Sequence, residues 1–401
     1  MEIRKRTVQM ELWFVIVVAV LLFLKLRHDS YNDQDNVAEP KITSPECNSG
    51  RLSPYARVFD QMEWCDSVAR PDPMQLKNAP LIFFDHRVLF HGYNSGKCKY
   101  VCRFTRDIKE YPKAALAFFT KEPPPEAINA STNIVWGLET GESPVHWPRI
   151  SPDLQSRFRV FSLTNTQSQI PRLYGLFRAF NKPRCVISDE IRKRMLLVDN
   201  RKWLPKNHKH RTSLSAAVVM SNMHAHNQRN AIISELSRLM QVDRYGKHYQ
   251  PCFEANCFEM ISKKSKFYLA FENSNCQDYV TEKLFRNAFM NGLVPIVYGT
   301  REDNYKDLAP PNSYIHVNQF QSLKHLVEYL KYLHENDTAY ANYFAWKEYG
   351  EVQLYPRLDC RMCGFLHQYL RGDVRLQENQ FSFYSDHRRL CNNGSHRVTF
   401  T

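Results

Sequence analysis

Residues 266–299, KFYLAFENSNCQDYVTEKLFRNAFMNGLVPIVYG, predict the architecture of this chain more clearly than any other segment. Lys266 to Phe271 is rich in aromatic and aliphatic residues, which predicts a buried strand. After a polar loop, apolar residues recur with helical spacing as far as Asn291-Gly292, a pair typical of a helix end. Leu293 to Tyr298 predicts a second buried strand. A strand, a helix and a strand in this order form a βαβ unit with parallel strands.

Thr281 lies where this helix is expected to begin, because threonine is a common N-cap residue. The free amides of the first turn then face the crevice beyond the carboxyl end of the first strand, where ligands bind in such units. A helix N-terminus in that position favours an anion. The segment therefore predicts an α/β fold with an anion site beside Thr281.

A second unit begins at Leu214 to Met220, LSAAVVM, which predicts another strand. The loop SNMHAHNQ follows, and a helix is expected from about Arg229. Arg229 is therefore expected near the carboxyl end of a parallel strand, where a guanidinium can form two hydrogen bonds with a phosphate. Because most arginines at helix starts are simply solvated, this residue alone does not establish a phosphate site.

Four apolar runs in the earlier part of the chain predict further strands: Leu81 to Phe84, Ala114 to Phe119, Asn133 to Leu138, and Arg159 to Leu163. They are assigned to an N-terminal α/β domain over residues 76–205. A second α/β domain is expected over residues 206–365, followed by a tail over residues 366–401. The basic run of residues 201–211 contains a proline and is interpreted as a solvated linker between the two domains.

The composition is that of a globular protein with an ample core, since 43% of the 401 residues are hydrophobic and 24% are charged. The net charge of +13 is compatible with nucleic acid, an anionic membrane or an anionic substrate as partner. No recognisable RNA-binding motif and no zinc-finger spacing occurs in the sequence. Nucleic acid is therefore not expected as a partner.

The N-terminal segment is typical of an uncleaved signal anchor. Leu12 to Leu24 is uninterrupted and apolar, Arg4-Lys5-Arg6 precedes it, and no small-residue cleavage site follows. The positive-inside rule places residues 1–9 in the cytosol, residues 10–26 in the membrane and the rest in the lumen. Residues 27–75 are mainly polar with prolines, which predicts a stem.

Eleven cysteines and three sequons fit a lumenal catalytic part. An odd number of cysteines implies disulfides with at least one residue left over. The two predicted α/β domains, residues 76–365, contain no DxD motif, so no metal site is predicted. The sequons predict glycosylation at Asn129, Asn336 and Asn393.

The run FENS followed by DYVTEK, an apolar helix and VPIVYG resembles the signature of the α-1,3-fucosyltransferases, Golgi enzymes that use GDP-fucose. The similarity continues through NYKDLAPPNSYIHVNQFQS to YFAWKE, Tyr343 to Glu348, so it covers the C-terminal half densely. The resemblance implies a GT-B type fold, in which two Rossmann-like domains face a cleft. This fold would follow the transmembrane signal anchor and the stem, in a single-pass type II protein of the Golgi membrane.

The resemblance also assigns donor contacts. VVMSN followed by Arg229 resembles the family pattern VVSN with an arginine, apart from one inserted methionine. It implies that Ser221, Asn222 and Arg229 contact GDP-fucose, with the arginine on the diphosphate. Asn273 and Tyr279 are implied as further donor contacts.

Glu282 and Lys283 form the centre of the predicted donor site. Glu282 could merely complement the helix dipole. A carboxylate there would nevertheless repel a diphosphate, so it is better explained as an acceptor for hydroxyls of ribose or fucose, with Lys283 offsetting the phosphate charge. The resemblance implies the same assignment. The expected donor is GDP-fucose, with no obligatory cofactor and a divalent cation, Mn²⁺ or Mg²⁺, as a stimulator at most.

Glu142, in GLETGESPVHWP, is the candidate general base. Pro144 forces Ser143 to be extended, and this geometry projects the carboxylate from a rigid turn. A solvated loop glutamate is the ordinary interpretation of such a residue. In the family, however, ESP is followed by a histidine, as in Glu142-Ser-Pro-Val-His146, and its glutamate is the catalytic base. Glu139 is the local competitor.

The GT-B resemblance suggests how two pairs of cysteines are bonded: Cys98 and Cys102 in the first domain, and Cys360 and Cys363 near the end of the second. Such a chain typically crosses back to its first domain near the end of the second, where the second pair lies. Spacings of four and three residues suit two parallel bridges, and the competing arrangement is a local bridge within each pair. The candidates are Cys98 with Cys360 and Cys102 with Cys363.

One segment departs from the family. Many members carry NWTxxYRxDSD after the base loop, whereas Phe161 to Gly175, FSLTNTQSQIPRLYG, lacks that arginine and those aspartates. This departure leaves the choice of acceptor open. It does not affect the predicted contacts with the donor GDP-fucose.

The sequence therefore predicts an inverting α-1,3-fucosyltransferase that transfers L-fucose to the 3-hydroxyl of a GlcNAc in a glycoprotein glycan. The acceptor is either an antenna of the N-acetyllactosamine type or the N-glycan core. The CRMC tail resembles the core-type members of invertebrates and plants more closely. The alternative is a non-catalytic Golgi protein that retains the fold and binds glycans or anionic lipid. A base in the first domain together with a diphosphate site in the second favours the enzyme.

Overall fold

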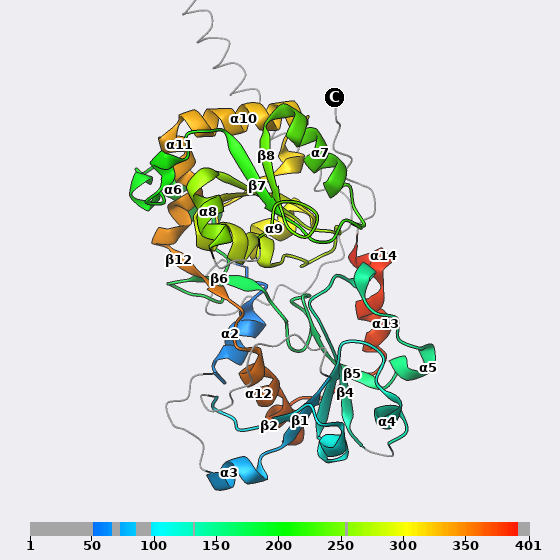
Figure 1. Ribbon diagram of the computed structural model, residues 1–401. Helices are drawn as coiled ribbons and strands as arrows, with labels where there is room; N and C mark the ends of the chain where they lie inside the picture. Colours follow the sequence, from blue (N-terminus) through cyan, green and yellow to red (C-terminus); the bar gives the residue numbers. More distant parts are fainter. Residues whose placement is uncertain (1–50, 66–72, 86–97, 131–132, 253–255, 392–401) are drawn as a thin grey trace, which may run out of the picture. The chain divides into compact units, whose positions relative to one another are not determined.

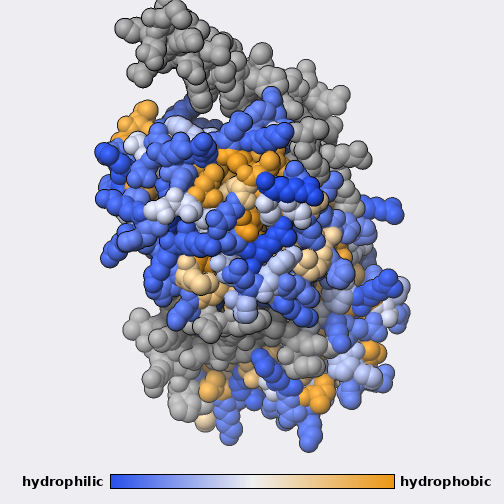
Figure 2. Space-filling view, turned by 45° about the horizontal axis from the view of Figure 1, so that its top comes forward, coloured by the Kyte–Doolittle hydropathy of each residue, from blue (hydrophilic) through white to orange (hydrophobic). Residues whose placement is uncertain are grey.

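The computed structural model describes residues 51–65, 73–85, 98–130, 133–252 and 256–391 (Figure 1). The predicted anchor and the sequon at Asn393 lie outside these residues. Within the described part of the chain, no helix combines the length and the hydrophobicity that crossing a bilayer requires. Figure 2 shows one face of the molecule, on which hydrophilic side chains predominate and hydrophobic ones gather in smaller groups.

The first domain contains a parallel sheet with the strand order β2-β1-β3-β4-β5. Four strands correspond to the predicted ones, with ends shifted by up to two residues; β2 was not predicted because it has only three residues, two of them half-buried. The strands are β1 (Leu81–Phe84), β2 (Arg103–Thr105), β3 (Leu116–Phe119), β4 (Val135–Thr140) and β5 (Phe158–Leu163).

Short helices and turns connect these strands. They are η2 (Ile108–Lys113), α4 (Pro125–Ile128), η3 (Pro144–His146) and α5 (Pro152–Gln155). The two faces of the sheet are covered mainly by segments from the far end of the chain. On one face pack Met362 and Phe365 of α12 (Leu358–Leu370), and on the other pack Phe381 and Tyr384 of α13 (Gln380–Ser385). Helix α13 of the predicted C-terminal tail therefore packs on the first domain, and so does the end of the predicted second domain at Met362 and Phe365.

The second domain contains a parallel sheet with the order β11-β10-β9-β7-β8. The predicted βαβ unit is confirmed, since Val294 pairs with Phe267 in parallel register. The strands are β7 (Ser215–Val219), β8 (Gln241–Tyr245), β9 (Phe267–Phe271), β10 (Val294–Tyr298) and β11 (Ile315–His316). The helices of this domain are α7 (Arg229–Leu239), α8 (Cys257–Lys264), α9 (Glu302–Leu308), α10 (Leu323–Glu335) and α11 (Asp337–Ala341).

The crossover from β9 to β10 differs from the predicted helix. It is a π-helix, η6 (Lys283–Ala288), followed by the 3₁₀ turn η7 (Phe289–Asn291). The N-cap is Glu282 and not Thr281, because the Thr281 hydroxyl donates to Glu272 at 2.8 Å. Gly292 ends the crossover with a φ of 62°, which glycine adopts without steric cost. π-turns are rare and occur frequently at functional sites.

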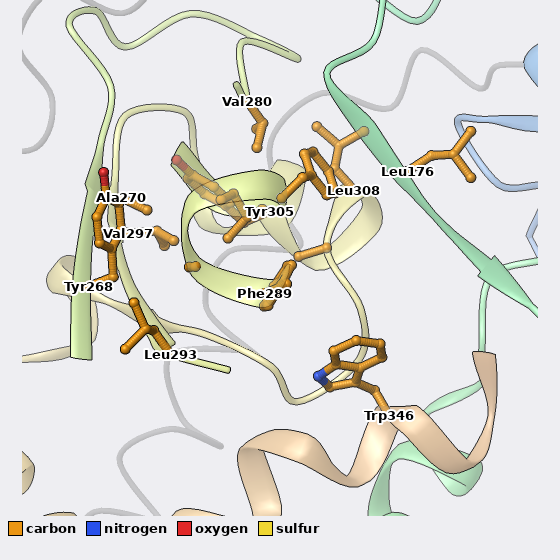
Figure 3. Packing of buried hydrophobic residues seen from close by; sticks show 14 of the residues in the cluster. Leu176, Tyr268, Ala270, Val280, Phe289, Leu293, Val297, Tyr305, Leu308 and Trp346 are labelled. Carbon is orange, nitrogen blue, oxygen red and sulfur yellow. The ribbon is translucent and has the colours of Figure 1, made fainter. Parts of the chain in front are cut away.

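The apolar side of this crossover lies in the core, as its spacing predicted. Leu284, Phe285, Ala288 and Phe289 are all buried. Figure 3 shows Phe289 near Trp346 and Leu293, and Leu176 from the strand β6 (Gly175–Ala179) beside the same cluster. β6 pairs in antiparallel fashion with β12 (Gly350–Leu354), a two-stranded ribbon that the sequence patterns did not predict.

The connection between the domains is more buried than predicted. It contains α6 (Asp189–Met195) and the 3₁₀ turns η4 (Arg201–Trp203) and η5 (His208–His210). Arg211, assigned to a solvated linker, is 2% exposed and donates to the carbonyls of Ser262 and Gly292 at 2.7 and 2.8 Å. The guanidinium thus satisfies backbone groups that water cannot reach.

Two further 3₁₀ segments belong to the second half of the chain. They are η8 (Val317–Gln319), which follows β11, and η9 (Asn342–Glu348), which follows α11.

Part of the predicted stem is folded. Helix α2 (Ala56–Met62) buries Val58 and Phe59 in the core, and Tyr55 donates to the Leu308 carbonyl at 2.8 Å. A further helix, α3 (Pro73–Asn78), precedes β1. The folded part of the chain therefore begins before residue 76, where the stem was expected to end.

Both predicted cross-domain bridges are present: Cys98 is bonded to Cys360 and Cys102 to Cys363. The local alternative is excluded, and α12 is fixed to the segment before β2. Two further bridges, Cys252–Cys257 and Cys276–Cys391, were not predicted. Cys185 is also disulfide-bonded.

Candidate functional site

The carboxyl ends of β7 and β9 form the ligand edge of the second sheet. From β7 the chain continues to β8 on one side, and it returns as β9 on the other. Ligands of open α/β sheets bind beyond the strands at such a switch point. The loop after β7 leads to Arg229, and the loop after β9 carries residues 272–280, which we call the donor loop.

Arg229 begins α7 and is 3% exposed. Its guanidinium donates to the Phe271 carbonyl at 3.2 Å and to the Asn222 carbonyl. Its Nε is buried and has no hydrogen-bond partner among the described residues. Burial lowers the pKa of Arg229, and Glu272 opposes this shift. The structure thus holds a cation with one unused donor where the sequence predicted a phosphate contact.

The other residues predicted around this edge differ in exposure. Ser221 and Asn222 are exposed after β7, and the Asn222 side chain accepts the His224 amide at 2.8 Å. Asn273 is 7% exposed, and its carbonyl accepts the His226 amide at 2.7 Å. The loops after β7 and β9 are therefore joined directly by their backbones.

Lys283 is the second predicted cation, and a buried carboxylate fixes its position. Its ammonium group lies 2.9 Å from Glu272, 2.8 Å from the Thr281 hydroxyl and 3.2 Å from Glu282. Burial alone would lower the pKa of Lys283, but Glu272 and Glu282 outweigh it and raise that pKa. Lys283 is therefore charged at neutral pH.

Glu272 is a site residue that the sequence interpretation missed. It directly follows β9, is 1% exposed, and also accepts the Thr281 amide at 2.8 Å. Burial raises its pKa, while Lys283 opposes the shift. A polar residue directly after a buried parallel strand was the available signal, because that position lies at the ligand edge.

Glu282 is partly accessible, with 34% of its side chain exposed. Burial would raise the pKa of its carboxyl, but the neighbouring Lys283 and hydrogen bonds outweigh burial, and the net shift is downward. Glu282 is thus an ionised acceptor at the start of η6. This arrangement fits the predicted hydrogen bonds to sugar hydroxyls better than a contact with a phosphate.

Glu142 is exposed in the loop that follows β4, residues 141–147, which we call the base loop. Ser143 is extended, with φ of −70° and ψ of 156°, as Pro144 predicted. The Tyr279 hydroxyl donates to the Glu142 carboxylate at 3.3 Å, and Trp147 Nε1 donates to the Glu142 carbonyl at 3.1 Å. The candidate base and the donor loop therefore meet.

A second contact joins the same two loops. The hydroxyls of Ser143 and Ser274 lie 2.7 Å apart, and both side chains are fully buried. Tyr279 is also buried, and burial raises its pKa well above the ordinary value, to which Glu272 and Glu142 add. Tyr279 consequently stays protonated and remains a hydrogen-bond donor to Glu142.

Glu139, the competing base, is engaged elsewhere. It is 1% exposed and forms an ion pair with Arg172. Burial raises the pKa of Glu139, although Arg172 opposes the shift. Of the two candidate carboxylates, Glu142 is therefore the one that a ligand can reach.

The segment that departs from the family, residues 161–175, contacts the donor loop. Thr166 donates through its amide and its hydroxyl to Asp278 at 2.9 and 2.8 Å. Asn304 donates to the other Asp278 oxygen at 2.6 Å. Tyr174 donates to the Gly141 carbonyl at 3.2 Å, and burial raises the pKa of its hydroxyl to about 12. Asp278 and Tyr174 were not predicted as site residues, because only tertiary contacts reveal their position.

His146 lies beside the base loop and the start of α7. Its ring is 6.4 Å from that of His226, and its Nε2 is buried with no hydrogen-bond partner among the described residues. Burial lowers the pKa of His146, and His226 and Arg229 add to this, while Glu142 opposes it. The imidazole is therefore neutral at pH 7.

Groups of potential metal ligands occur elsewhere in the described residues. One contains Cys102, Cys363 and His367, and the other contains Cys98, Asp359 and Cys360. All four cysteine sulfurs are used in disulfides. Neither group is therefore a credible metal site.

A polar cavity of about 490 Å³ lies at the carboxyl end of β10. It is lined by Asn275 and Gln277 of the donor loop, by the turn before α9, and by Arg388 and Arg389. Glu142, Arg229 and Lys283 are not among its lining residues. This cavity therefore adjoins the predicted donor site without containing its charged groups.

Two predicted glycosylation sites fall on described residues. Asn129 is exposed at the end of α4. Asn336 is half-buried and caps α11, with its side chain accepting the Ala339 amide at 2.9 Å. Asn129 is therefore the more accessible of the two.

Residues 208–377 match the family described as glycosyltransferase family 10 (fucosyltransferase), C-term. The chain is similar to glycoprotein 3-alpha-L-fucosyltransferase A of Drosophila melanogaster, at 44% identity over 38% of this chain and 31% of the relative. It is also similar to 4-galactosyl-N-acetylglucosaminide 3-alpha-L-fucosyltransferase FUT6 of Homo sapiens, at 41% identity over 36% of this chain and 40% of the relative. The matches therefore span less than half of the length of these relatives. A crystal structure of an alpha1,3-fucosyltransferase is similar with a TM-score of 0.49 and 19% identity, over 81% of this chain and 98% of that one.

Proposed function

We propose that this protein is an inverting α-1,3-fucosyltransferase, which the match of residues 208–377 to glycosyltransferase family 10 (fucosyltransferase), C-term, supports. It transfers L-fucose from GDP-fucose to the 3-hydroxyl of a GlcNAc residue. The observation that carries the proposal is the hydrogen bond from Tyr279 of the donor loop to the exposed carboxylate of Glu142. It brings a candidate base of the first domain to the donor loop of the second.

The donor diphosphate lies between Arg229 and Lys283 in this proposal. Both are cations at the ligand edge of the sheet, and the buried Nε of Arg229 is free to donate among the described residues. As the glycosidic bond breaks, negative charge grows on the departing diphosphate. Fixed cations in a water-poor site stabilise such charge strongly, because they need no reorganisation.

Glu142 takes the proton from the acceptor hydroxyl. The acceptor oxygen forms a bond with the anomeric carbon of fucose while the bond from that carbon to the phosphate oxygen breaks. Attack opposite the leaving group inverts the anomeric configuration. The exposure of Glu142 gives a glycan access, and the protonated Tyr279 orients the carboxylate.

The acceptor is a glycoprotein glycan in this proposal. The support is the similarity to the Drosophila protein, whose name specifies a glycoprotein acceptor. Both the N-glycan core and an antenna of the N-acetyllactosamine type offer a GlcNAc with a 3-hydroxyl. We favour the core, for which the CRMC segment, Cys360 to Cys363, is the supporting feature.

We also propose a Golgi location, with the catalytic part in the lumen. The support is the apolar run Leu12 to Leu24 after three basic residues. The disulfides of the folded part fit an oxidising compartment.

The decisive experiment incubates the purified full-length protein with GDP-fucose and a panel of glycan acceptors. Glu142→Gln is expected to lower the transfer rate at least about a hundredfold, the contribution of a general base. Glu126→Gln, at another exposed glutamate of the first domain, is the matched control and should keep the wild-type rate. Donor binding without transfer to any acceptor would instead support the non-catalytic glycan-binding alternative.

A further inference from the structure

The end of the described chain returns to the first domain through α13. The Phe381 ring lies 5.8 Å from that of Phe158 and 6.4 Å from that of Trp147. The Tyr384 ring packs against that of Phe161, with centroids 4.9 Å apart, and its hydroxyl donates to the Gln167 carbonyl at 3.0 Å. These contacts fix α13 on the sheet of the first domain. We call residues 380–391 the C-terminal strap.

The other end of the strap is fixed to the second domain. After α14 (His387–Leu390), Cys391 forms a disulfide with Cys276 of the donor loop. The Gln277 amide donates to the Leu390 carbonyl at 2.8 Å. The strap therefore joins the two domains, by packing on the first domain and by a disulfide to the second.

The base loop lies between these two anchor points. At one end, Trp147 contacts Phe381 and also donates to the Glu142 carbonyl. At the other, Val145 packs against a buried cluster that contains Leu390, Tyr279 and the Cys276–Cys391 bridge. The strap thus contacts the base loop at Val145, in the turn η3, and at Trp147 just after it. It also contacts Tyr279, which donates to Glu142.

We propose that the strap positions the catalytic base, with Phe381 and Leu390 as positioning residues and the Cys276–Cys391 bridge as the fastening. The inference rests on the proposed function, in which Glu142 is the base. Glu142 is exposed, and its carboxylate accepts a long hydrogen bond from Tyr279 at 3.3 Å. Its direction must therefore come largely from the packing of the base loop. A misplacement of about 1 Å can cost a hundredfold in rate.

The first test compares two phenylalanines of the same helix. Phe381 is 7% exposed and packs against the first domain, whereas Phe383 is 37% exposed. Phe381→Leu is expected to lower kcat about tenfold or more while the KM for GDP-fucose stays within about twofold, because only the base side is loosened. Phe383→Leu should leave both constants unchanged. An unchanged kcat in Phe381→Leu, or an equal loss in both variants, would overturn the proposal.

The second test compares two disulfides. Cys276→Ser/Cys391→Ser releases the strap, and Cys252→Ser/Cys257→Ser removes a bridge within the second domain. Hydrogen–deuterium exchange of a peptide covering residues 141–147 should become at least several-fold faster in the first variant only. Equal exchange in both variants would contradict a role of the strap. If the first variant fails to fold, Leu390→Ala tests the same contact with the bridge intact.

The two tests separate this inference from the proposed function. A wild-type protein that transfers no fucose refutes the proposed function, whatever the strap does. The exchange measurement needs no activity and still shows whether the strap holds the base loop. An active wild type with an unchanged kcat in Phe381→Leu refutes the positioning role alone.

Discussion

The ammonium group of Lys283 lies 2.9 Å from the carboxylate of Glu272, a side chain that is only 1% exposed. The Thr281 amide and hydroxyl donate to the same carboxylate at 2.8 Å. Glu272 thus receives three donors at the turn from β9 into η6. A buried acid of this kind holds the cation at the ligand edge and prevents it from reaching into solvent.

Replacing this acid should destabilise the protein. Glu272→Gln removes the charge that compensates Lys283, and breaking a buried ion pair typically costs about 3–5 kcal/mol. Denaturant unfolding measures the loss. Glu259→Gln is the control, because Glu259 pairs with Lys263 on the surface and should change stability little. Equal losses in the free energy of unfolding of the two variants would show that the buried Glu272–Lys283 pair stabilises the protein no more than a surface ion pair does.

Loss of Lys283 should weaken the binding of GDP itself and not only of GDP-fucose. The ammonium is proposed to meet the diphosphate, and a charged hydrogen bond contributes about 1.5–3 kcal/mol. Lys283→Ala should therefore raise the Kd for GDP at least about tenfold in calorimetry. Lys263→Ala, at an exposed lysine, should leave it unchanged. Unchanged GDP affinity in Lys283→Ala would exclude the phosphate role.

The sequence predicted the parts of the fold whose signal is local. β1, β9 and β10 are short apolar runs, and all of their residues are buried. β6 and β12 were missed because each carries exposed or half-buried residues and pairs with a strand far away in the chain. The spacing of Leu284, Phe285 and Phe289 suits an α-helix as well as a π-helix, so the pattern could not distinguish them.

The sequence predicted those site residues that are charged and lie between a predicted strand and the helix that follows it. Arg229 and Lys283 each follow a predicted strand and begin a helix, which is an anion-binding arrangement. Glu272 acquires its role only when Lys283 folds back across eleven positions of sequence. The strap could not be anticipated at all, since its contacts join residues more than a hundred positions apart.

His146 should make the stability of the protein depend on pH. Burial, with His226 and Arg229, lowers its pKa below the ordinary value of 6.5, although Glu142 opposes the shift. The unfolded chain therefore binds a proton more readily, so stability is full above pH 6.5 and falls as pH decreases through the lower folded pKa. His146→Gln should flatten this slope in unfolding experiments, whereas His248→Gln, at an exposed histidine, should not. An unchanged slope in His146→Gln would refute this.

Activity should persist in part after treatment with EDTA. In the proposed function, Arg229 and Lys283 supply the positive charge that a metal ion would otherwise provide to the departing diphosphate. Fucose transfer by the full-length protein should therefore be measurable in a chelator, and added Mn²⁺ should raise the rate at most several-fold. Complete loss in EDTA that Mn²⁺ restores would contradict catalysis by protein cations alone.

The paired bridges Cys98–Cys360 and Cys102–Cys363 should stabilise the fold in a strongly non-additive way. Each spans more than 260 residues of sequence, so the first bridge to form closes a very long loop in the unfolded chain. Once it exists, the second bridge closes only the short segments 98–102 and 360–363. In the chain-entropy model a loop of that length contributes about 2 kcal/mol, against about 5 kcal/mol for the long one.

Removing either bridge alone should therefore cost about 2 kcal/mol, because the other still closes the long loop. Removing both should cost about 7 kcal/mol, well above the sum of the single losses. Denaturant unfolding of Cys98→Ser/Cys360→Ser, Cys102→Ser/Cys363→Ser and the fourfold variant measures this. Non-reducing peptide mapping first confirms that the remaining bridge is intact. Losses that add up across the three variants would show that the bridges act through native-state packing and not through the entropy of the unfolded chain.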